Sequence, residues 1–472
     1  MQTKRLLQIF APLFALLLAP AAQAVVVVGG DNDWEVSFDG NVNGFYVIED
    51  SDPRPANPAA FMRATHDGSA AGMTSVNTTR LGGNITPDQK SSRIRTGLLP
   101  AFFSFNVRSP EVAGLRGSAR ISFAPQIQID NRKNNFGSGQ QAGAQIDMRE
   151  VFFNIDGEFG TVSVGRTLSL HQRHNILTDM TLFGVGAQGG QAGGGTTLGR
   201  IGYGYVYPQF NARISYKTPQ VNGFQLEIGI YDPSRIASDR IQGDAVSPTW
   251  NETSSPRFET EATYATTYTG GTLKAWLGGL WQTAEIAGNN APAWRDDEVT
   301  AYGIHGGAVL GFEGFELTGS GYVGEALGTT LMLDADAVDY CGDEREHSGY
   351  IIQGTYTFNG RTKFGVSYGA SMADETDNDK ARRTVGAPSA ACTLAAAPAD
   401  PTSDPLTNTV LDANVATAFV GTEEQNALTV GLYHDVTSWF KVMAEYSKVE
   451  HEWFDGATQE ADVFAVGSFF LW

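Results

Sequence analysis

The sequence contains few charged residues and, beyond its first residues, no long apolar run. Only 18% of its 472 residues are charged, and the 52 acidic residues outnumber the 32 basic ones, a formal net charge of −20. Such a chain is a poor partner for nucleic acid, because binding phosphate requires a basic face. A membrane-spanning helix needs about 20 consecutive apolar residues. No such helix is expected in the body of the chain.

The one apolar stretch, residues 6–19, has the features of a secretory signal. Lys4 and Arg5 precede it, Pro12 interrupts it, and Ala22-Gln23-Ala24 supplies small residues at the cleavage site. The stretch is too short, and too broken by proline, to span a membrane. We expect residues 1–24 to be removed and residues 25–472 to form the mature chain.

Glycine, aromatic residues and strict alternation are abundant. Glycine accounts for 55 residues and aromatics for 11% of the chain, which suits many strands with tight turns and aromatic girdles. Apolar and polar side chains alternate in residues 224–231, 361–368 and 439–447. This is the period of a β-strand, but a soluble β-sandwich also alternates. The connections between strands therefore decide the fold.

The pattern predicts an all-β fold of about sixteen strands. The expected strands are 34–48, 92–108, 114–130, 145–156, 160–169, 200–217, 223–232, 257–268, 272–284, 298–310, 315–326, 347–358, 361–371, 426–434, 438–450 and 460–472. Even-numbered strands end in tight turns such as Asn359-Gly360, whereas odd-numbered strands are followed by longer polar segments. An even strand number with short periplasmic turns and long external loops is typical of a transmembrane antiparallel β-barrel.

In such a barrel the apolar face of each strand meets lipid and the polar face meets water. Closing the sheet pairs every edge, which lipid demands because it cannot solvate backbone groups. A barrel of this size is too wide for side chains to fill its interior, so the sequence predicts a water-filled channel.

Residues 464–472 are rich in aromatic residues, with Phe464, Val466, Phe470 and Trp472 on one face. This segment resembles the last strand of the Gram-negative porins, in which Phe is commoner than Trp at the end. Residues 149–166 look like the hairpin before the third external loop. The loop itself, residues 171–199, contains Thr178-Asp179-Met180 and is followed by Arg200.

The resemblance implies a general porin of the outer membrane of a Gram-negative bacterium. Such a porin is a homotrimer in lipid and lipopolysaccharide, has no cofactor, and passes small hydrophilic solutes and ions by passive diffusion. Its third loop folds inward and constricts the pore. The family usually continues with Pro-Glu-Phe-Gly-Gly where this chain has Thr181-Leu182-Phe183-Gly184. Because that Glu is absent, strong cation selectivity is not expected. A solute-specific porin for a sugar, phosphate or organic acid remains the alternative.

Five residues are candidates for the pore constriction. Arg116 and Arg120 fall on the polar face of strand 114–130. Arg149 and Arg200 correspond by motif to the family's basic ladder, and Asp179 would be their acidic counterpart across the pore. Inward charges tune porin selectivity, although these arginines could instead only solvate the wall or pair with Glu.

No metal site or enzyme active site is expected. His171, Arg173 and His174 lack a third ligand at fixed spacing, so a solvated loop or lumen lining is expected there. The acidic runs 334–346 and 374–379 suggest a solvated, charged mouth, with divalent cation binding as the alternative. A barrel lipase needs a Ser–His pair, and no His stands in such a context. A purely adhesive or structural barrel is a further alternative.

The two cysteines, Cys341 and Cys392, fall in external loops on either side of the 347–371 hairpin. An exported protein permits disulfides. We expect either a bond between these loops or two separate thiols.

Overall fold

A computed structural model describes most of the mature chain. The described residues are 25–29, 33–52, 62–63, 89–128, 146–188, 196–238, 249–286, 297–333, 336–339, 341–383 and 419–472. Residues 1–24 lie outside this set, so the signal peptide stays a prediction.

The described chain is almost entirely β-strand. Its elements are β1 (Val25–Gly29), β2 (Glu35–Ser51), β3 (Met62–Arg63), β4 (Gln89–Arg95), β5 (Phe102–Arg108), β6 (Arg116–Pro125), β7 (Ile146–Gly157), β8 (Gly160–Leu168), α1 (Arg173–Leu177), η1 (Met180–Phe183), β9 (Phe210–Lys217), β10 (Phe224–Tyr231), β11 (Ile236–Ala237), β12 (Thr249–Trp250), β13 (Arg257–Tyr268), β14 (Gly271–Glu285), β15 (Glu298–Phe312), β16 (Phe315–Glu325), β17 (Glu346–Phe358), β18 (Thr362–Ala373), α2 (Asp377–Arg383), β19 (Phe419–Val420), β20 (Thr422–Asp435), β21 (Phe440–Trp453) and β22 (Thr458–Leu471). No helix among the described residues has the length and apolarity needed to cross a membrane.

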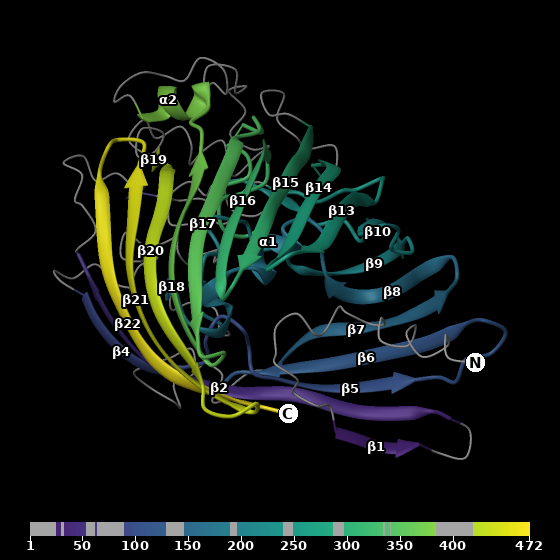
Figure 1. Ribbon diagram of the computed structural model, residues 1–472. Coiled ribbons are helices and arrows are strands. Elements are labelled where there is room, and N and C mark those ends of the chain that lie inside the picture. The colour runs from purple at the N-terminus through teal and green to yellow at the C-terminus, as the bar shows by residue number, and fades with distance from the viewer. Residues whose placement is uncertain are drawn as a thin grey trace, which may run out of the picture.

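The strands form a closed antiparallel barrel (Figure 1). Its wall has sixteen strand positions, each called a stave below. The sheet contains 18 labelled strands, but β4 and β5 are two parts of one stave and β1 lies beside the start of β2. The ring closes where β2 pairs with β22, from Asn41 opposite Leu471 to Ser51 opposite Ala461. The predicted fold class and strand number are therefore confirmed.

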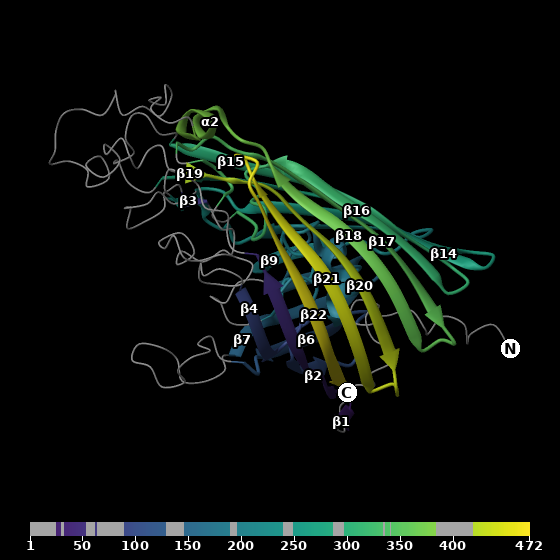
Figure 2. The same cartoon turned by 90° about the vertical axis from the view of Figure 1, so that its left-hand side faces the viewer.

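The two ends of the barrel differ. Short turns join β7 to β8 and β17 to β18, whereas longer segments follow β8, β16 and β18. Figure 2 shows α2 at the end with the long connections, while the turn between β20 and β21 and the C-terminus lie at the other. The alternation of short turns and long loops thus has the arrangement that the sequence indicated.

The outer face of the wall is apolar and the inner face is largely polar. Ile228 on β10, Leu432 on β20 and Val466 on β22 are all exposed on the outside. On the inner face of the same strands, Glu227 and Thr429 are buried by chain that enters the barrel. The exposed apolar band is what lipid requires, and the closed ring leaves it no unpaired edge.

Two predicted strands are wrong in detail. Strand 92–108 is interrupted, because residues 96–101 leave the wall between β4 and β5. Strand 200–217 begins only at Phe210, since residues 200–209 belong to a loop inside the barrel. Gly97, Pro100 and Pro208 stand in these breaks, where a regular ladder cannot use proline as a donor.

Candidate functional site

The interior of the barrel is occupied by the described parts of loop 3, residues 169–188 and 196–209. This connection between β8 and β9 carries α1 and η1, and Figure 1 shows α1 inside the ring of strands. It reaches the opposite wall at Gln353 of β17. That side chain accepts the N–H of Met180 at 2.8 Å and donates to the carbonyl of Thr178 at 2.8 Å. A long external connection therefore crosses the lumen instead of standing in solvent.

A carboxylate of β21 holds the tip of loop 3. Glu445 accepts the backbone N–H groups of Val185 at 2.7 Å and Gly186 at 2.9 Å. A Cβ added to Gly184 would lie only 1.7 Å from Glu445 Oε1. Only a residue without a side chain fits where the loop meets this carboxylate. The loop sequence lacks the family's usual Glu, and the wall supplies an acid at its tip.

The interrupted stave of β4 and β5, which β22 and β2 separate from β21 along the wall, supports the same loop. Leu98 donates its N–H to the carbonyl of Gly184 at 2.9 Å, and Leu99 donates to Leu182 at 3.1 Å. The break would leave backbone groups without partners. Asn43 meets part of this need, since its amide donates to the carbonyl of Leu99 and accepts the N–H of Gly97. The residues in the break of the wall thus support loop 3.

A buried charge network fixes the start of loop 3. Arg173 donates to Glu227 of β10 at 2.9 Å and to Glu261 of β13 at 3.0 Å. His174 Nδ1 lies 2.8 Å from Glu261 Oε2, and His171 donates its backbone N–H to Glu259. The expectation that His171, Arg173 and His174 are solvated is wrong. All three are buried, because the carboxylates that pair with them are on the adjacent wall.

Burial sets the protonation of this segment. It lowers the pKa of His171 well below 6.5, with His305 and Arg257 adding to the effect against Glu261. It also lowers the pKa of His174, although Glu261 acts in the opposite direction. Both rings are therefore neutral at pH 7. The Nδ1 atoms of His171 and His305 lie 3.1 Å apart, which is a hydrogen-bond distance.

Asp179 lies within loop 3 and not on an open surface. Its side chain accepts the N–H of Thr181 at 2.8 Å, which caps η1, and the hydroxyl of Tyr205 at 2.8 Å. Burial raises the pKa of Asp179, and Arg200 and these hydrogen bonds counteract the rise. The carboxylate joins the outgoing and returning halves of the loop.

Arg200 is fully buried where the loop returns along the wall. Its guanidinium donates to the backbone carbonyls of Ser367 on β18 and Ala427 on β20. Burial lowers the pKa of Arg200, while Asp179 and Glu445 favour the charge. The alternation of inward and outward residues along the sequence does not determine whether Arg200 points into the lumen or toward the wall. The structure directs its side chain to the wall.

The other three arginines lie on the wall itself. Arg120 of β6 points inward, 2.7 Å from Asp39 and 2.7 Å from Glu150, and 16% of its side chain is exposed. Arg149 of β7 is 2.8 Å from Asp147 and stacks 5.6 Å from the ring of Phe210. Arg116 lies toward the short turns beside Glu111 at 3.4 Å. The structure brings together Asp179 and Arg200, but these three form separate pairs.

The residues that the sequence reasoning missed are carboxylates of the inner wall. Glu227, Glu259, Glu261 and Glu445 receive loop 3, and all lie on polar faces of predicted strands. The alternation of the strands predicts that these carboxylates face inward, and Glu259 and Glu261 share one face of one strand. The sequence does not reveal which residues they bind, because Arg173 and Glu261 are 88 residues apart in the chain.

The external loops also differ from the expected solvated mouth. Asp336, Asp339 and Asp379 are buried, with at most 2% exposure. Cys341 is buried beside Asp339, which accepts its backbone N–H. Cys392 lies outside the described residues, so the disulfide stays a prediction. Within the described parts of the chain, no three His, Cys, Asp or Glu side chains gather as metal ligands.

A family model for Gram-negative porins matches residues 12–452. The chain belongs to the Gram-negative porin family. Among solved structures, this porin is similar to the outer-membrane channel DcaP of Acinetobacter baumannii, with a TM-score of 0.59 and 13% identity, covering 95% of this chain and 100% of that one. It is also similar to the anion-selective porin of Comamonas acidovorans, with a TM-score of 0.51 and 14% identity, covering 93% and 100%. A comparison with curated protein sequences finds no match.

The family and the fold agree on the class of function. The protein is a porin channel of the outer membrane and not an enzyme, as the sequence predicted. The remaining questions concern what limits passage through it.

Proposed function

We propose that this porin lets small hydrophilic solutes and ions diffuse passively and that loop 3 constricts the pore. The observation that carries the proposal is the set of contacts between this loop and widely separated staves, through Gln353, Glu445 and Glu261. A loop held from opposite sides of a barrel narrows the space through which water and solutes pass.

Single-channel recording in planar bilayers tests the proposal. The protein should give stepwise, ohmic currents, and liposomes that contain it should swell with small neutral sugars but not with large ones. A variant in which a short linker replaces residues 176–199 should conduct more than the native protein. An equal or lower conductance in that variant would contradict the constriction by loop 3.

We further propose two roles for the five constriction residues. Asp179 and Arg200 maintain the shape of the loop from within, because both are buried. Arg116, Arg120 and Arg149 supply positive charge on the wall, although each stands beside a carboxylate. Since the charges are nearly balanced, we expect weak ion selectivity with a mild preference for anions.

The competing proposal is a pore specific for a sugar, phosphate or organic acid. It is favoured by the rigid seating of loop 3 on buried charges, since a fixed constriction can present a defined site. The same recordings separate the two proposals. A specific solute would block the ion current with saturation at low concentration, whereas a general pore shows no saturation.

We also propose a homotrimer in outer-membrane lipid and lipopolysaccharide. A hollow of about 520 Å³ on the outer wall near the first and last staves supports it, lined by Val42, Ile127, Trp439 and Phe470. Such an apolar depression suits a neighbouring subunit. Native mass spectrometry in mild detergent should find three chains, and a stable monomer would count against the trimer.

A further inference from the structure

A second external connection enters the barrel beside loop 3. This is loop 6, between β16 and β17, of which residues 326–333, 336–339 and 341–345 are described. Leu327 lies against the inner face of the wall, where a Cβ added to Gly303 would be 2.7 Å from Leu327 Cδ1, and one added to Gly324 would be 2.8 Å away. The exposed neighbours Ile304 and Val323 point outward, so these glycines mark the lumen side. They leave room for the loop to pack directly on the backbone of the wall.

Loop 6 contributes to an apolar core inside the mouth. Leu327, Met332 and Val338 are fully or almost fully buried, and they pack with Leu280 of β14 and Val299 of β15. Loop 4, residues 232–256, joins the same core through Ile236 and Trp250. The segment is therefore folded in place and does not project into solvent.

Loop 6 also contacts the constriction loop. Tyr207 of loop 3 donates its N–H to the carbonyl of Thr330 at 2.9 Å. A Cβ at Gly202 would lie 2.4 Å from Thr330 Oγ1, and Gln425 of β20 donates to the same hydroxyl at 3.3 Å. The two loops thus meet within the barrel, and each limits the position of the other.

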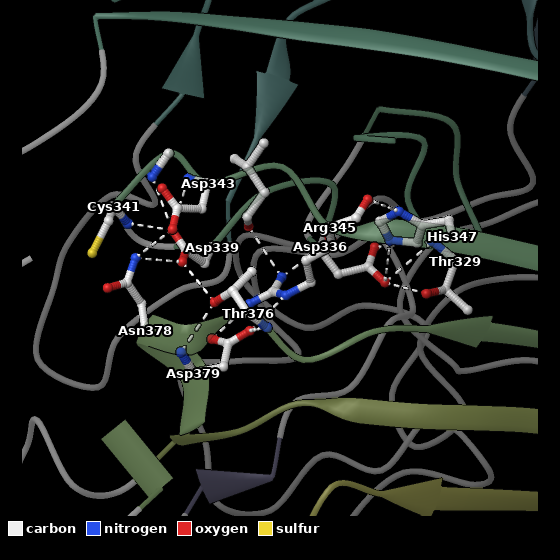
Figure 3. Close-up of polar contacts among 12 residues, drawn as sticks. Thr329, Asp336, Asp339, Cys341, Asp343, Arg345, His347, Thr376, Asn378 and Asp379 are labelled. Carbon is white, nitrogen blue, oxygen red and sulfur yellow. Dashed lines mark hydrogen bonds and ion pairs between the residues drawn. The ribbon is translucent and has the colours of Figure 1, made fainter. Parts of the chain in front are cut away.

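Buried polar contacts tie loop 6 to α2 at the beginning of the next external connection (Figure 3). Arg345 forms two hydrogen bonds to the carboxylate of Asp379, at 2.8 and 2.9 Å, and both side chains are 2% exposed. Asp339 accepts the N–H groups of Cys341, Gly342 and Asp343. Its other oxygen accepts from Thr376 and Asn378.

We propose that loop 6 is a second constriction element, held in the lumen by the Arg345–Asp379 pair and by Asp339. The inference rests on the proposed function of the protein as a diffusion channel. Loop 6 takes up part of the cross-section next to loop 3, so passage depends on both loops. We call the Arg345–Asp379 pair and Asp339 the latch. The latch maintains this arrangement, because a buried ion pair that loses one partner leaves an uncompensated charge, and that charge drives the segment toward water.

The chain offers a matched pair of substitutions to test the latch. Asp379→Ala removes the buried partner of Arg345. Asp377→Ala removes a carboxylate two residues away in the same helix that is 95% exposed and pairs with the exposed Lys380. Single-channel conductance should rise about 1.5-fold in Asp379→Ala, with more open-channel noise, because the free cross-section increases. Asp377→Ala should conduct as the native protein does.

A second variant decides the question if Asp379→Ala fails to fold. Glu325 and Glu346 pair directly across β16 and β17, so an Asn-Gly turn can join them in place of residues 326–345. This variant also carries Cys392→Ser, which avoids a lone thiol. Its conductance should exceed that of the native protein, and it should admit larger neutral sugars in liposome swelling.

The outcomes separate the two proposals. If the native protein gives no channels, the proposed function fails before loop 6 is tested. If the native protein conducts and neither folded variant conducts more than Asp377→Ala, loop 6 does not constrict the pore. Heat-modifiable gel mobility establishes for each variant that the barrel has folded.

Discussion

At the scale of single residues, polar groups inside this barrel serve two purposes. Arg120 borders the lumen among carboxylates. Arg173 and Arg200 of loop 3 bind the wall, Glu445 of the wall binds loop 3, and all three are buried. Alternation along the strands predicted which wall residues face inward, Glu445 and Arg120 included. It could not show that Asp179 and Arg200 turn toward the loop and the wall, because loop 3 has no regular period to read.

Replacing Glu445 with Ala should release the tip of loop 3. Two backbone N–H groups would lose their acceptor, a loss of about 1–3 kcal/mol for buried donors. We expect noisier channel currents and a lower unfolding temperature. Glu460→Ala is the control, since that carboxylate is 44% exposed beside Lys448. If the two variants behave alike in channel recordings, the tip does not depend on Glu445.

The attachment of residues 170–178 of loop 3 to the wall, called the seat of the loop, should become less stable in acid. Burial lowers the pKa of His171 well below its ordinary 6.5, so the native ring stays neutral where an unfolded one binds a proton. Stability from this seat is present above about pH 6.5 and declines as pH falls. His305, Arg257 and Glu261 act on the ring, and Glu259 accepts the backbone N–H of His171.

Hydrogen exchange of residues 170–178, corrected for intrinsic rates, should be faster at pH 5.5 than at pH 7.5. His171→Gln should remove much of this difference, and His434→Gln at the turn end should not. An unchanged pH response in His171→Gln would contradict the assignment to this ring.

Arg120 should affect ion selectivity. Arg120→Ala leaves Asp39 and Glu150 without the cation between them, so the reversal potential in a salt gradient should shift toward cations. Low ionic strength gives the largest shift because screening is weakest there. Arg166, exposed on the other face of the wall, supplies the control variant Arg166→Ala. No difference between the two would place the selectivity of the pore elsewhere.

At the scale of elements, most strands could be predicted and the interruptions could not. Alternation and turn signals locate the staves because wall residues obey a period of two. Residues 96–101 break that period with Gly97 and Pro100, which disfavour a regular strand, yet the alternation on both sides predicted one strand over residues 92–108. Nothing local indicated that the break would support Gly184 from a loop more than 80 residues further along.

Gly184 should tolerate no side chain. In Gly184→Ala the new Cβ would overlap the carboxylate of Glu445, and such overpacking costs about 1–3 kcal/mol. Gly354→Ala on β17 is the matched control, because nothing lies within 4 Å of its added Cβ. Thermal unfolding monitored by gel mobility should show a lower midpoint for the first variant only, and equal midpoints would refute the close fit.

At the scale of the whole molecule, the sequence predicted a closed barrel but not how its interior is filled. Closure follows from the even number of staves and the need to pair every edge in lipid. The filling depends on contacts such as Val185 with Glu445, which are 260 residues apart along the chain. Such contacts leave no local pattern. The resemblance implied that loop 3 folds inward, but the expectation that His171, Arg173, His174 and the carboxylates of loop 6 are solvated was wrong.

The pairing of Gly40 with Trp472 has a consequence for the order of folding. The N–H and carbonyl groups of these two residues bond each other, each at 3.1 Å, and so join the first stave to the last residue of the chain. The ring cannot close before β22, the last strand of the barrel in chain order, reaches the membrane. Because loop 3 takes its partners from β17, β18, β20 and β21, its position inside the barrel must form after most staves are in place. Contacts so distant in sequence favour slow assembly, during which the half-built wall exposes unpaired strand edges that need protection from aggregation.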